Sequence, residues 1–565
     1  MRARRSRRPW VGLCGLIGLV WCGLAASTLP AGDVGDAAVR VSLHMPVRDL
    51  NPLTAAHAAS AQVTDYLFDH LLERASDALD RYEGALAERW DVSDDGLVLT
   101  FQLRRGVRWH DGQPFTARDV AFTLRLCRRP ELASPLAQAL GDVETCEVID
   151  DHAVRFRLAR PSWRVFAVLV ESAFPILPRH RLEAAGPEAL AEFGRRPIGT
   201  GPYRFVRHDA ASNALTLERN EHYWGDRPAI GRIVFKVLTD RAAALAEFKR
   251  GGVDFLSRLS ADDFFGLLED RRWTAARIRE ALRDGSGVFL LPPGAGGRFG
   301  LGAFATTRVS FVAWNCRRPP LDERGVRRAL ASLLDRRGFG RDPSRSLGRP
   351  VTGDQVWFGP AYNHEVPCRP LDPAAARAEL EEAGWFDRDG DGWLDRAGRR
   401  LTVRITYPAQ ADDAVLRQLQ GAARTAGVEV LLDGLEHGLF TRRKNERDFD
   451  GLYLAWVLDV EEDPYVAWHS CAAVDGANYS GFAAADALIE EARATADPAR
   501  RWSLLRRLHA RIDAEQPVLF VQAETLLVAW QPRLSGVRFH PLKPSGWDIR
   551  EWGIADAPPQ AASPR

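Results

Sequence analysis

The sequence predicts an α/β fold of several domains, in which strands and helices follow one another along the chain and pack in layers. The apolar patterns of residues 97–103 and 309–315 predict strands, and residues 117–127 and 414–426 are predicted as helices. Residues 285–302 are rich in glycine and are predicted to form a loop. The 565 residues are too many for one hydrophobic core, which indicates roughly two to four domains.

Composition and charge indicate a soluble globular protein that does not bind nucleic acid. Apolar residues make up 46% of the chain and charged residues 27%, as in ordinary soluble proteins. The formal net charge of +1 becomes −4 once the five arginines of residues 2–8 are set aside. Because a slightly acidic protein is not attracted electrostatically to the negatively charged phosphate backbone, we expect no nucleic-acid partner.

Residues 1–32 have the pattern of an export signal. Five arginines at 2–8 precede an apolar run at 11–26, and Pro30-Ala31-Gly32 ends the segment. We therefore expect a periplasmic or other extracytoplasmic protein, exported by the general or the twin-arginine route. An uncleaved single-span anchor is the alternative, although residues 11–26 fall short of the about 20 apolar residues that a membrane-spanning helix needs.

The cysteines permit disulfides but indicate no zinc site. Five cysteines lie beyond the export signal, and no two of them form a CxxC pair: Cys127, Cys146, Cys316, Cys368 and Cys471. An oxidising compartment allows disulfides, and we expect one between the nearest pair, Cys127 and Cys146. The odd number leaves at least one thiol free or bonded to another molecule.

The stretch VRWHDGQPFTARDV, residues 107–120, sets His110 beside Asp111, as a catalytic or metal site would. Asp111 and the glycine that follows it favour a tight turn. Thr116, with Asp119 three residues later, is a capping box that starts a helix. Local physical chemistry therefore explains this stretch as a turn and a helix start, without catalysis.

No motif indicates an enzyme or a resident cofactor. The Gly-x-Ser-x-Gly of hydrolases and the GxxxxGK[ST] phosphate loop are both absent. His364-Glu365 begins like a zinc-binding HExxH helix, but the last position is Cys368 and Pro367 would break the helix. We predict no catalytic residue, no metal ligand and no cofactor.

An acidic segment, Asp387–Asp395, resembles the first part of a calcium loop. Acids stand at alternating positions and glycine stands at the sixth. The twelfth position, where a calcium loop places a bidentate glutamate, is Gly398. The alternative is a tight acidic turn between a helix at 374–383 and a strand that begins at Leu401.

A strand at 449–459 ends with a carboxylate beside an aromatic side chain, because Trp456 and Asp459 close the segment. Such a carboxylate can pair with the ammonium group of a ligand, since a desolvated charge needs an opposite partner. The alternative is that Asp459 caps a helix or lies in a loop. Residue spacing alone favours this second interpretation.

Several segments, in this order, resemble the extracellular solute-binding proteins of family 5, the peptide- and nickel-binding components of ABC importers. Residues 85–124 are similar to the family signature nearly throughout, and GTGPYRF, RNEHYWGDRPAIGRIVF, AGWFDRDGDGW and NYSGFAAADALIEEA follow. The resemblance covers roughly residues 40–550. It implies an α/β, periplasmic binding protein-like fold with two large lobes joined by a hinge and an extra small domain.

The resemblance also implies how the chain is divided among domains. The chain would start in domain I, leave for the small domain II, return, build domain III and end in domain I. Solute would be enclosed between domains I and III as the hinge closes. The expected ranges are 1–32 for the export signal, 33–68 for the first part of domain I, 69–203 for domain II, 204–304 for the second part of domain I, 305–523 for domain III, 524–555 for the last part of domain I, and 556–565 for a disordered tail.

The resemblance implies a peptide site made by two segments. In peptide-binding members, an aspartate at the position of Asp459 receives the α-ammonium group of the peptide. The strand before it would offer backbone groups to an extended peptide, as in strand addition, and a segment of domain I would face the peptide. The expected ligand-binding residues are Asp459, Trp456, Val457, Leu458, Ala58 and Ala59.

The chain departs from the family pattern in two places. Dipeptide-binding members carry an arginine for the ligand carboxylate shortly after a Pro-x-Gln, but here Ala411-Asp412-Asp413 follows residues 408–410. This argues against a strict preference for dipeptides and leaves longer peptides and non-peptide solutes. Cys471 lacks the second cysteine that some relatives carry near Phe482, so its thiol is expected to be free.

We therefore expect an exported, non-enzymatic substrate-binding protein of an ABC transporter. It would capture a peptide-like solute between two lobes, deliver it to permease subunits in the inner membrane, and act as a monomer. The alternatives are an exported hydrolase, a ligand sensor on the same fold, and a binder of a non-peptide solute.

Overall fold

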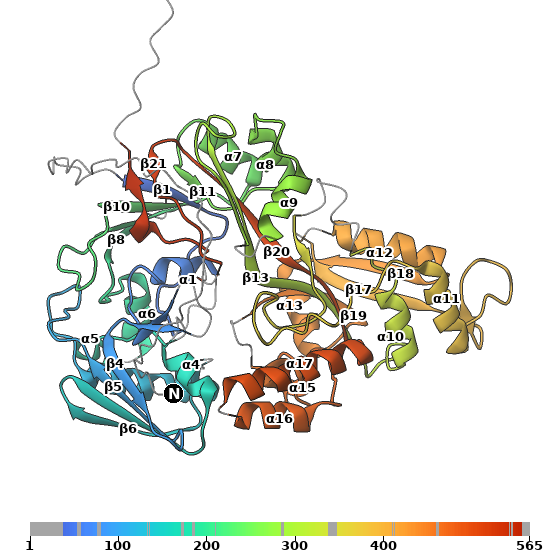
Figure 1. The fold of residues 1–565 in the computed structure, drawn as a ribbon, viewed down its shortest axis with the longest axis horizontal. Coiled ribbons are helices and arrows are strands. Elements are labelled where there is room, and N and C mark those ends of the chain that lie inside the picture. Colours follow the sequence, from blue (N-terminus) through green and yellow to red (C-terminus); the bar gives the residue numbers. More distant parts are fainter. Residues whose placement is uncertain are drawn as a thin grey trace, which may run out of the picture.

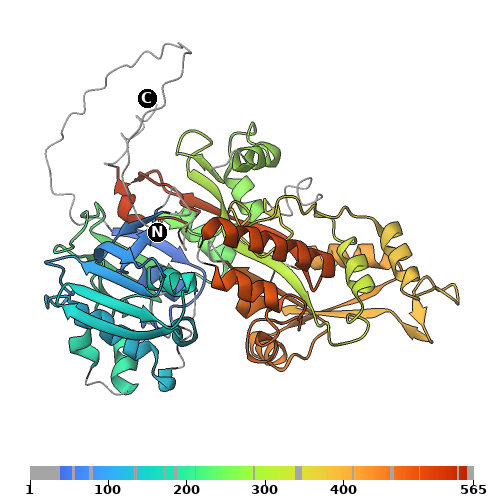
Figure 2. The same cartoon turned by 60° about the horizontal axis from the view of Figure 1, so that its bottom comes forward.

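The computed structural model arranges the chain as two lobes, shown in Figure 1. Figures 1 and 2 both place the small blue sheet of the first lobe and the yellow and orange elements of the second lobe at opposite ends. The export signal expected at 1–32 and the tail expected at 556–565 lie outside the described residues. The structure describes residues 38–53, 58–75, 81–132, 134, 136–170, 174–183, 187–209, 211–283, 287–336, 347–409, 411, 413–458, 463–495, 497–541, 543 and 546–555.

A sheet of twelve strands runs through both lobes, in the order β18-β17-β19-β13-β20-β11-β1-β10-β9-β8, with β12 on β13 and β14 on β20. β1 is parallel to its neighbours β10 and β11, and β17 is parallel to β18 and β19. The strands are β1 (Ala38–Leu43), β8 (Tyr203–Asp209), β9 (Ala214–Arg219), β10 (Arg232–Val237), β11 (Phe255–Leu256), β12 (Val288–Leu291), β13 (Gly300–Trp314), β14 (Arg349–Pro350), β17 (Thr402–Pro408), β18 (Glu429–Leu435), β19 (Gly451–Val457) and β20 (Val518–Trp530).

The long antiparallel strands β13 and β20 carry the chain between the lobes (Figure 1). They pair from Gly300 and Trp530 at one end to Ala313 and Val518 at the other. The register shifts between Ala305 and Val309, where β13 forms a bulge. Because a bulge bends and twists a ladder, the sheet changes direction there.

The glycine-rich residues 285–302 contain two strand segments, 288–291 and 300–302, so the predicted loop is wrong there and is confirmed for residues 292–299. β12 pairs with β13, which begins at Gly300 and not at residue 309. A Cβ atom would lie 2.1 Å from the Trp530 ring at Gly300 and 2.4 Å from the Phe539 ring at Gly302. These glycines therefore make room for aromatic rings, a use of glycine in strands that sequence does not distinguish from a loop.

The first lobe also contains a sheet of four antiparallel strands, in the order β4-β5-β7-β6. Its strands are β4 (Ala87–Val92), β5 (Val98–Leu103), β6 (Val143–Asp150) and β7 (Ala153–Leu158), and α2 (Ala117–Cys127) packs against β6 and β7. α2 confirms the predicted helix at both ends. The Asp119 carboxylate accepts a hydrogen bond from the Thr116 backbone N at 2.8 Å, as the capping box requires.

Residues 109–112 form a tight turn, called here the His110 turn. The partly buried His110 ring accepts a hydrogen bond from the Gly199 N at Nδ1 and donates one from Nε2 to the Gly201 O, both at 3.1 Å. Burial lowers the pKa of His110 to about 4, so the ring is neutral at pH 7. Asp111 pairs with His180 at 2.8 Å. The turn is thus structural, as predicted.

The remaining elements cover the sheets or connect them (Figure 1). Within the described ranges, no helix has the length and apolar character needed to cross a membrane. The first lobe has α1 (Ala58–Thr64), β2 (Leu72–Arg74), β3 (Tyr82–Gly84), η1 (Pro130–Leu132), α3 (Leu136–Ala139), α4 (Trp163–Val170), α5 (Arg179–Leu182), α6 (Pro187–Arg195), β21 (Leu534–Ser535), η3 (Ile549–Glu551) and β22 (Gly553–Ile554), with α7 (Arg241–Lys249), α8 (Ala261–Leu267) and α9 (Ala275–Arg283) above it. The second lobe has α10 (Arg324–Ala331), α11 (Pro373–Glu382), β15 (Asp395–Arg396), β16 (Arg399–Arg400), α12 (Ala414–Thr425), α13 (His437–Glu446), α14 (Tyr465–Trp468), α15 (Ala472–Asp475), α16 (Asp486–Ala494) and α17 (Pro498–Glu515).

The hydrophobic core is divided into clusters, and the main clusters belong to one lobe or the other. One cluster joins the small sheet to the β1 end of the large sheet, so that Phe101 and Phe235 belong to the same core. In the second lobe, Phe311 and Val312 of β13 belong to different clusters. Because successive side chains of a strand point to opposite faces, the sheet of the second lobe is covered on both faces.

The expected Cys127–Cys146 disulfide is wrong. Cys127 and Cys146 are both free thiols. Cys127 ends α2 and Cys146 lies in β6, and both pack in the core of the first lobe. Burial raises the pKa of each thiol to about 12. A disulfide needs a specific Cβ geometry, which closeness along the chain does not provide.

Candidate functional site

The candidate site lies at the end of β19 in the second lobe. A pocket of about 110 Å³ opens there. Two of the residues predicted from the sequence, Trp456 and Val457, line it. The other lining residues are Asp354, Val466, Ala467 and Ala477, which come from segments far apart in the chain.

β19 presents an open strand edge beside this pocket. On one side it pairs with β13 along its whole length, from Gly451 to Val457. On the other side β17 pairs with it only at Gly451 and Leu452. Among the described residues, no strand pairs with this side of β19 from Leu454 to Val457, a segment called here the β19 edge. Unpaired backbone groups on a strand edge can hydrogen-bond an added strand.

Packing fixes the end of β19. The Trp456 ring lies 4.1 Å from that of Phe311 and 5.8 Å from that of Trp468, measured between ring centroids. The Leu458 backbone N donates a hydrogen bond to the Thr307 O at 3.0 Å, and the Leu458 side chain is buried. Val457, in contrast, is 65% exposed. The strand end is therefore rigid yet accessible.

Asp354 contributes a carboxylate to the pocket, and this residue was not predicted from the sequence. Its side chain is 1% exposed and accepts a hydrogen bond from the Trp468 indole N–H. Burial raises the pKa of Asp354, because the charged form is poorly solvated there. The residue lies about one hundred positions before Trp456 in the sequence, so no local pattern connects the two.

The structure does not bring all the predicted ligand-binding residues together. Asp459 lies outside the described residues, so its pairing with an ammonium group stays a prediction. Ala58 and Ala59 begin α1 in the first lobe, whereas β19 is in the second (Figure 1). The Ala59 side chain is buried in the core of the first lobe, so any contact of Ala59 with solute has to come from its backbone.

The two lobes touch beside the site. Arg164 of α4, in the first lobe, lies 2.7 Å from the Asp463 carboxylate of the second lobe. Arg493 of α16 lies 3.4 Å from the same carboxylate. The Arg501 guanidinium of α17 lies over the ring of Trp163, 4.9 Å from its centroid. These contacts hold α4 against the helices that follow the β19 segment (Figure 1).

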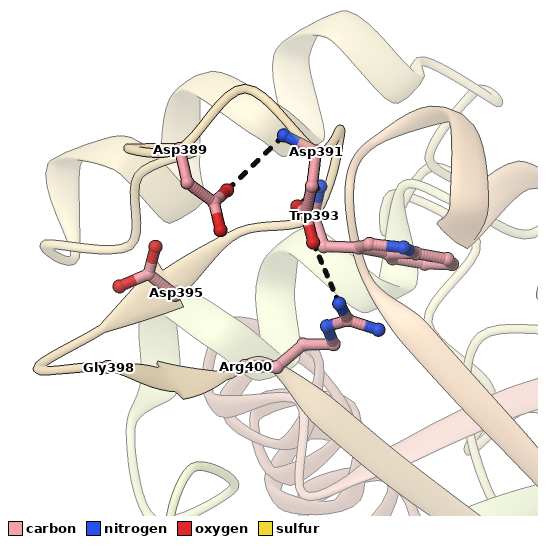
Figure 3. Close-up of a pocket in the computed structure, with 6 residues that line it drawn as sticks. All are labelled: Asp389, Asp391, Trp393, Asp395, Gly398 and Arg400. Carbon is pink, nitrogen blue, oxygen red and sulfur yellow. Dashed lines mark hydrogen bonds and ion pairs between the residues drawn. The ribbon is translucent and has the colours of Figure 1, made fainter.

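The acidic segment Asp387–Asp395 forms a tight turn on the far side of the second lobe, with a pocket of about 200 Å³ (Figure 3). The carboxylates of Asp387, Asp389 and Asp391 each offer an oxygen within 4.8 Å of the others. The turn itself uses them, since the Asp389 carboxylate accepts from the Asp391 N at 3.2 Å and Arg400 lies 2.7 Å from the Asp391 carboxylate. The predicted acidic turn is present, and we propose no metal function for it.

A family model matches most of the chain. The model describes the middle part of the bacterial extracellular solute-binding proteins, family 5, and it matches residues 81–478. The chain is also 25% identical to the oligopeptide-binding protein AppA of Bacillus subtilis (strain 168) over 523 residues, which cover 89% of each chain. It is 24% identical to the dipeptide-binding protein of Escherichia coli (strain K12) over 490 residues, or 81% of this chain and 84% of that protein.

Solved structures show the same fold. The structure of AppA from Bacillus subtilis in complex with a nonapeptide is similar over 92% of this chain and 99% of that one, with a TM-score of 0.74 and 24% identity. NikA from Brucella suis in complex with Fe(III)-EDTA is similar over 92% of this chain and all of that one, with a TM-score of 0.76 and 20% identity. These likenesses confirm the predicted α/β, periplasmic binding protein-like fold.

Proposed function

Because this chain belongs to the bacterial extracellular solute-binding proteins of family 5, we propose that it captures a peptide-like solute between its two lobes for an ABC transporter. The captured solute is handed to permease subunits in the inner membrane. The protein works as a monomer in the periplasm or an equivalent extracytoplasmic space, which it reaches through an export signal at 1–32. It binds its solute and releases it intact.

The β19 edge is the observation that carries this proposal. A peptide is the solute class whose backbone repeats the donors and acceptors of a strand, so it can continue a sheet at an unpaired edge. The edge runs from Leu454 to Val457, and the adjacent pocket accepts a side chain of the added strand. The bound peptide thus extends the sheet of the second lobe.

Individual residues have separate roles in this proposal. Trp456, Val457 and Leu458 present the strand end, and Asp459 pairs with the α-ammonium group of the peptide. Residues at Ala58 and Ala59 approach the peptide from the first lobe through backbone groups.

The domain ranges expected from the sequence complete the scheme. Domain I at 33–68, 204–304 and 524–555, together with domain II at 69–203, makes the first lobe. Domain III at 305–523 makes the second, and the lobes close over the solute.

Peptides with blocked backbone groups test the proposal. Calorimetry compares the purified chain with a set of pentapeptides and with the same peptides N-methylated at alternate residues. Methylation of the residues that donate to the β19 edge removes hydrogen bonds, which should weaken binding roughly two- to tenfold per bond. Methylation in the other register should have little effect. Equal effects of both registers would contradict strand addition, and peptide cleavage would favour a hydrolase.

A further inference from the structure

The pocket beside the β19 edge combines apolar walls with a single acid. Of the residues that line it, five are apolar: Trp456, Val457, Val466, Ala467 and Ala477. The sixth is Asp354, the one ionisable side chain among the described residues of the lining. An apolar wall suits an alkyl chain, and a carboxylate suits a cation. The pocket is therefore complementary to a side chain that has an apolar stem and a cationic end.

Asp354 lies at the inner end of this pocket. Val457, at the strand end, is 65% exposed, whereas Asp354 is 1% exposed. A side chain that enters beside Val457 thus reaches the carboxylate only after its stem has passed the apolar walls. Because water is excluded at the inner end, an ion pair formed there is stronger than one formed at the surface.

The Asp354 carboxylate has neutral partners only. It accepts hydrogen bonds from the Trp468 indole N–H and from the Gln355 side chain. Burial has the largest influence on its pKa and raises it, and no cation of the described residues acts on that pKa. A buried carboxylate without an opposite charge is costly. A cation of the solute would supply the charge that the described part of the chain does not.

Packing holds the segment that carries Asp354 in place. Val351 and Val356, on either side of it, are buried in the core of the second lobe. The Thr352 Oγ1 lies 3.0 Å from the His509 Nε2. A Cβ atom at Gly353 would lie 2.5 Å from the same ring. The carboxylate is therefore fixed at the pocket wall before any solute arrives.

The register of an added strand directs one of its side chains to this pocket. Trp456 packs on the sheet face that carries Phe311 and Trp468, and the segment of Asp354 packs on the same face. Directly opposite residues of neighbouring strands project from the same face of a sheet. The peptide residue opposite Trp456 therefore projects toward the face of Asp354, and the residues next to it in the peptide project toward the other face.

We propose that Asp354 is a specificity-determining residue, which binds the cationic end of one solute side chain in the pocket beside the β19 edge. This role rests on the proposed function and narrows its solute class to peptides with a lysine or arginine side chain at one position. It is separate from the pairing of Asp459 with the α-ammonium group, because the two carboxylates bind different cations of the same peptide.

Alanine pentapeptides with one substituted position test this role on the full-length chain. All have free termini, and the substituted residue is placed in turn at each of the five positions. It is lysine, arginine, norleucine, which has the alkyl stem of lysine without its charge, or Nε-acetyllysine, which has the length without the charge. Calorimetry measures the affinity of each peptide.

At one position the parent should bind lysine or arginine about tenfold more tightly than norleucine and acetyllysine, since hydrogen bonds between charged groups are strong. Asp354→Asn should reduce this preference to less than about twofold. The asparagine oxygen still accepts from the Trp468 indole, so the structural contact is kept. The affinity for the norleucine peptide should stay unchanged, which a merely structural role of Asp354 does not predict.

Asp69→Asn is the matched control. Asp69 is 2% exposed and accepts a hydrogen bond from the Trp224 indole N–H at 2.8 Å, but it lies in the first lobe and does not line the pocket. This variant should keep the preference of the parent. If Asp354→Asn does not fold, Ala477→Leu decides in its place, because a larger side chain at this partly exposed position fills the pocket and should remove the preference.

The outcomes separate this role from peptide capture. A parent that binds the peptides with no preference for a cation at any position would overturn the role of Asp354 and leave peptide capture standing. An unchanged preference in folded Asp354→Asn, or in Ala477→Leu where that variant decides, would overturn it in the same way. If the parent bound none of the peptides, peptide capture itself would be overturned, and the role of Asp354 with it.

Discussion

The His110 turn and the β19 edge both lie at the end of an extended segment, but they differ in whether their polar groups have hydrogen-bond partners within the chain. In the turn, both ring nitrogens of His110 are bonded to the backbone of Gly199 and Gly201, and Asp111 is paired. At the β19 edge, the backbone groups from Leu454 to Val457 have a described strand on one side only. The first region contributes stability, and the second offers binding groups. Polar residues alone therefore do not indicate function, whereas unpaired polar groups do.

The largest expected effect concerns binding at the strand end. Asp459→Asn removes the charge that pairs with the α-ammonium group of a peptide, which should cost about 3 kcal/mol, or about 100-fold in affinity. Calorimetry with a pentapeptide that has a free N-terminus measures this. The melting temperature should stay unchanged. Asp448→Asn serves as the control, and equal affinities of the two variants would exclude the ammonium role of Asp459.

The next effect concerns stability in the turn. His110→Leu leaves the Gly199 N–H and the Gly201 carbonyl without their partner, which should lower the free energy of unfolding by about 2 kcal/mol. Denaturant unfolding measures this value. Peptide affinity should stay unchanged, in contrast to the effect at Asp459. His208→Leu, at an exposed position of β8, should change stability by less than about 0.5 kcal/mol. A loss of affinity in His110→Leu would break the distinction between the two regions.

A pH series sharpens the same distinction. The folded pKa of His110, about 4, lies below the usual unfolded value near 6.5, so the unfolded chain binds more protons between these pH values. The stability that depends on neutral His110 is full above pH 6.5 and is lost as the pH falls toward 4. The destabilisation caused by His110→Leu should therefore shrink by about 1–2 kcal/mol between pH 7 and pH 5. A pH-independent difference between parent and variant would mean that His110 does not titrate as described.

The smallest effect concerns the contact between the lobes. Arg164→Gln removes the ion pair with Asp463 across the lobes. This should destabilise the closed form relative to the open form by about 1 kcal/mol, which corresponds to about fivefold weaker peptide affinity. The control is Arg160→Gln, because Arg160 pairs with Asp142 within the first lobe at 2.9 Å. Calorimetry compares the two variants. Identical affinities would show that this ion pair does not support closure.

Local signals predicted much of the fold. α2 begins and ends where its capping box and the residues before Pro130 place it. β13 was predicted only from residue 309, because Gly300 and Gly302 have the composition of a loop and serve instead to admit aromatic rings. The disulfide was wrong, because thiol geometry depends on packing between α2 and β6. Sequence patterns therefore predict helices and strands well where neighbouring residues in the sequence determine where the element begins and ends.

The site was predicted only in part. Trp456 and Val457 were identified through the family resemblance, and both line the pocket. Asp354 could not be connected with them, because distant segments of the chain meet at the pocket only in the folded structure. The role of Asp459 stays a prediction.

A crystal structure of the full chain with a retained pentapeptide tests the central claim most directly. The predicted result is a peptide whose main chain hydrogen-bonds the backbone of the β19 edge, between Leu454 and Val457, as an added strand beside β19. A peptide bound elsewhere, or held through side chains alone with the β19 edge uncovered, would contradict the claim.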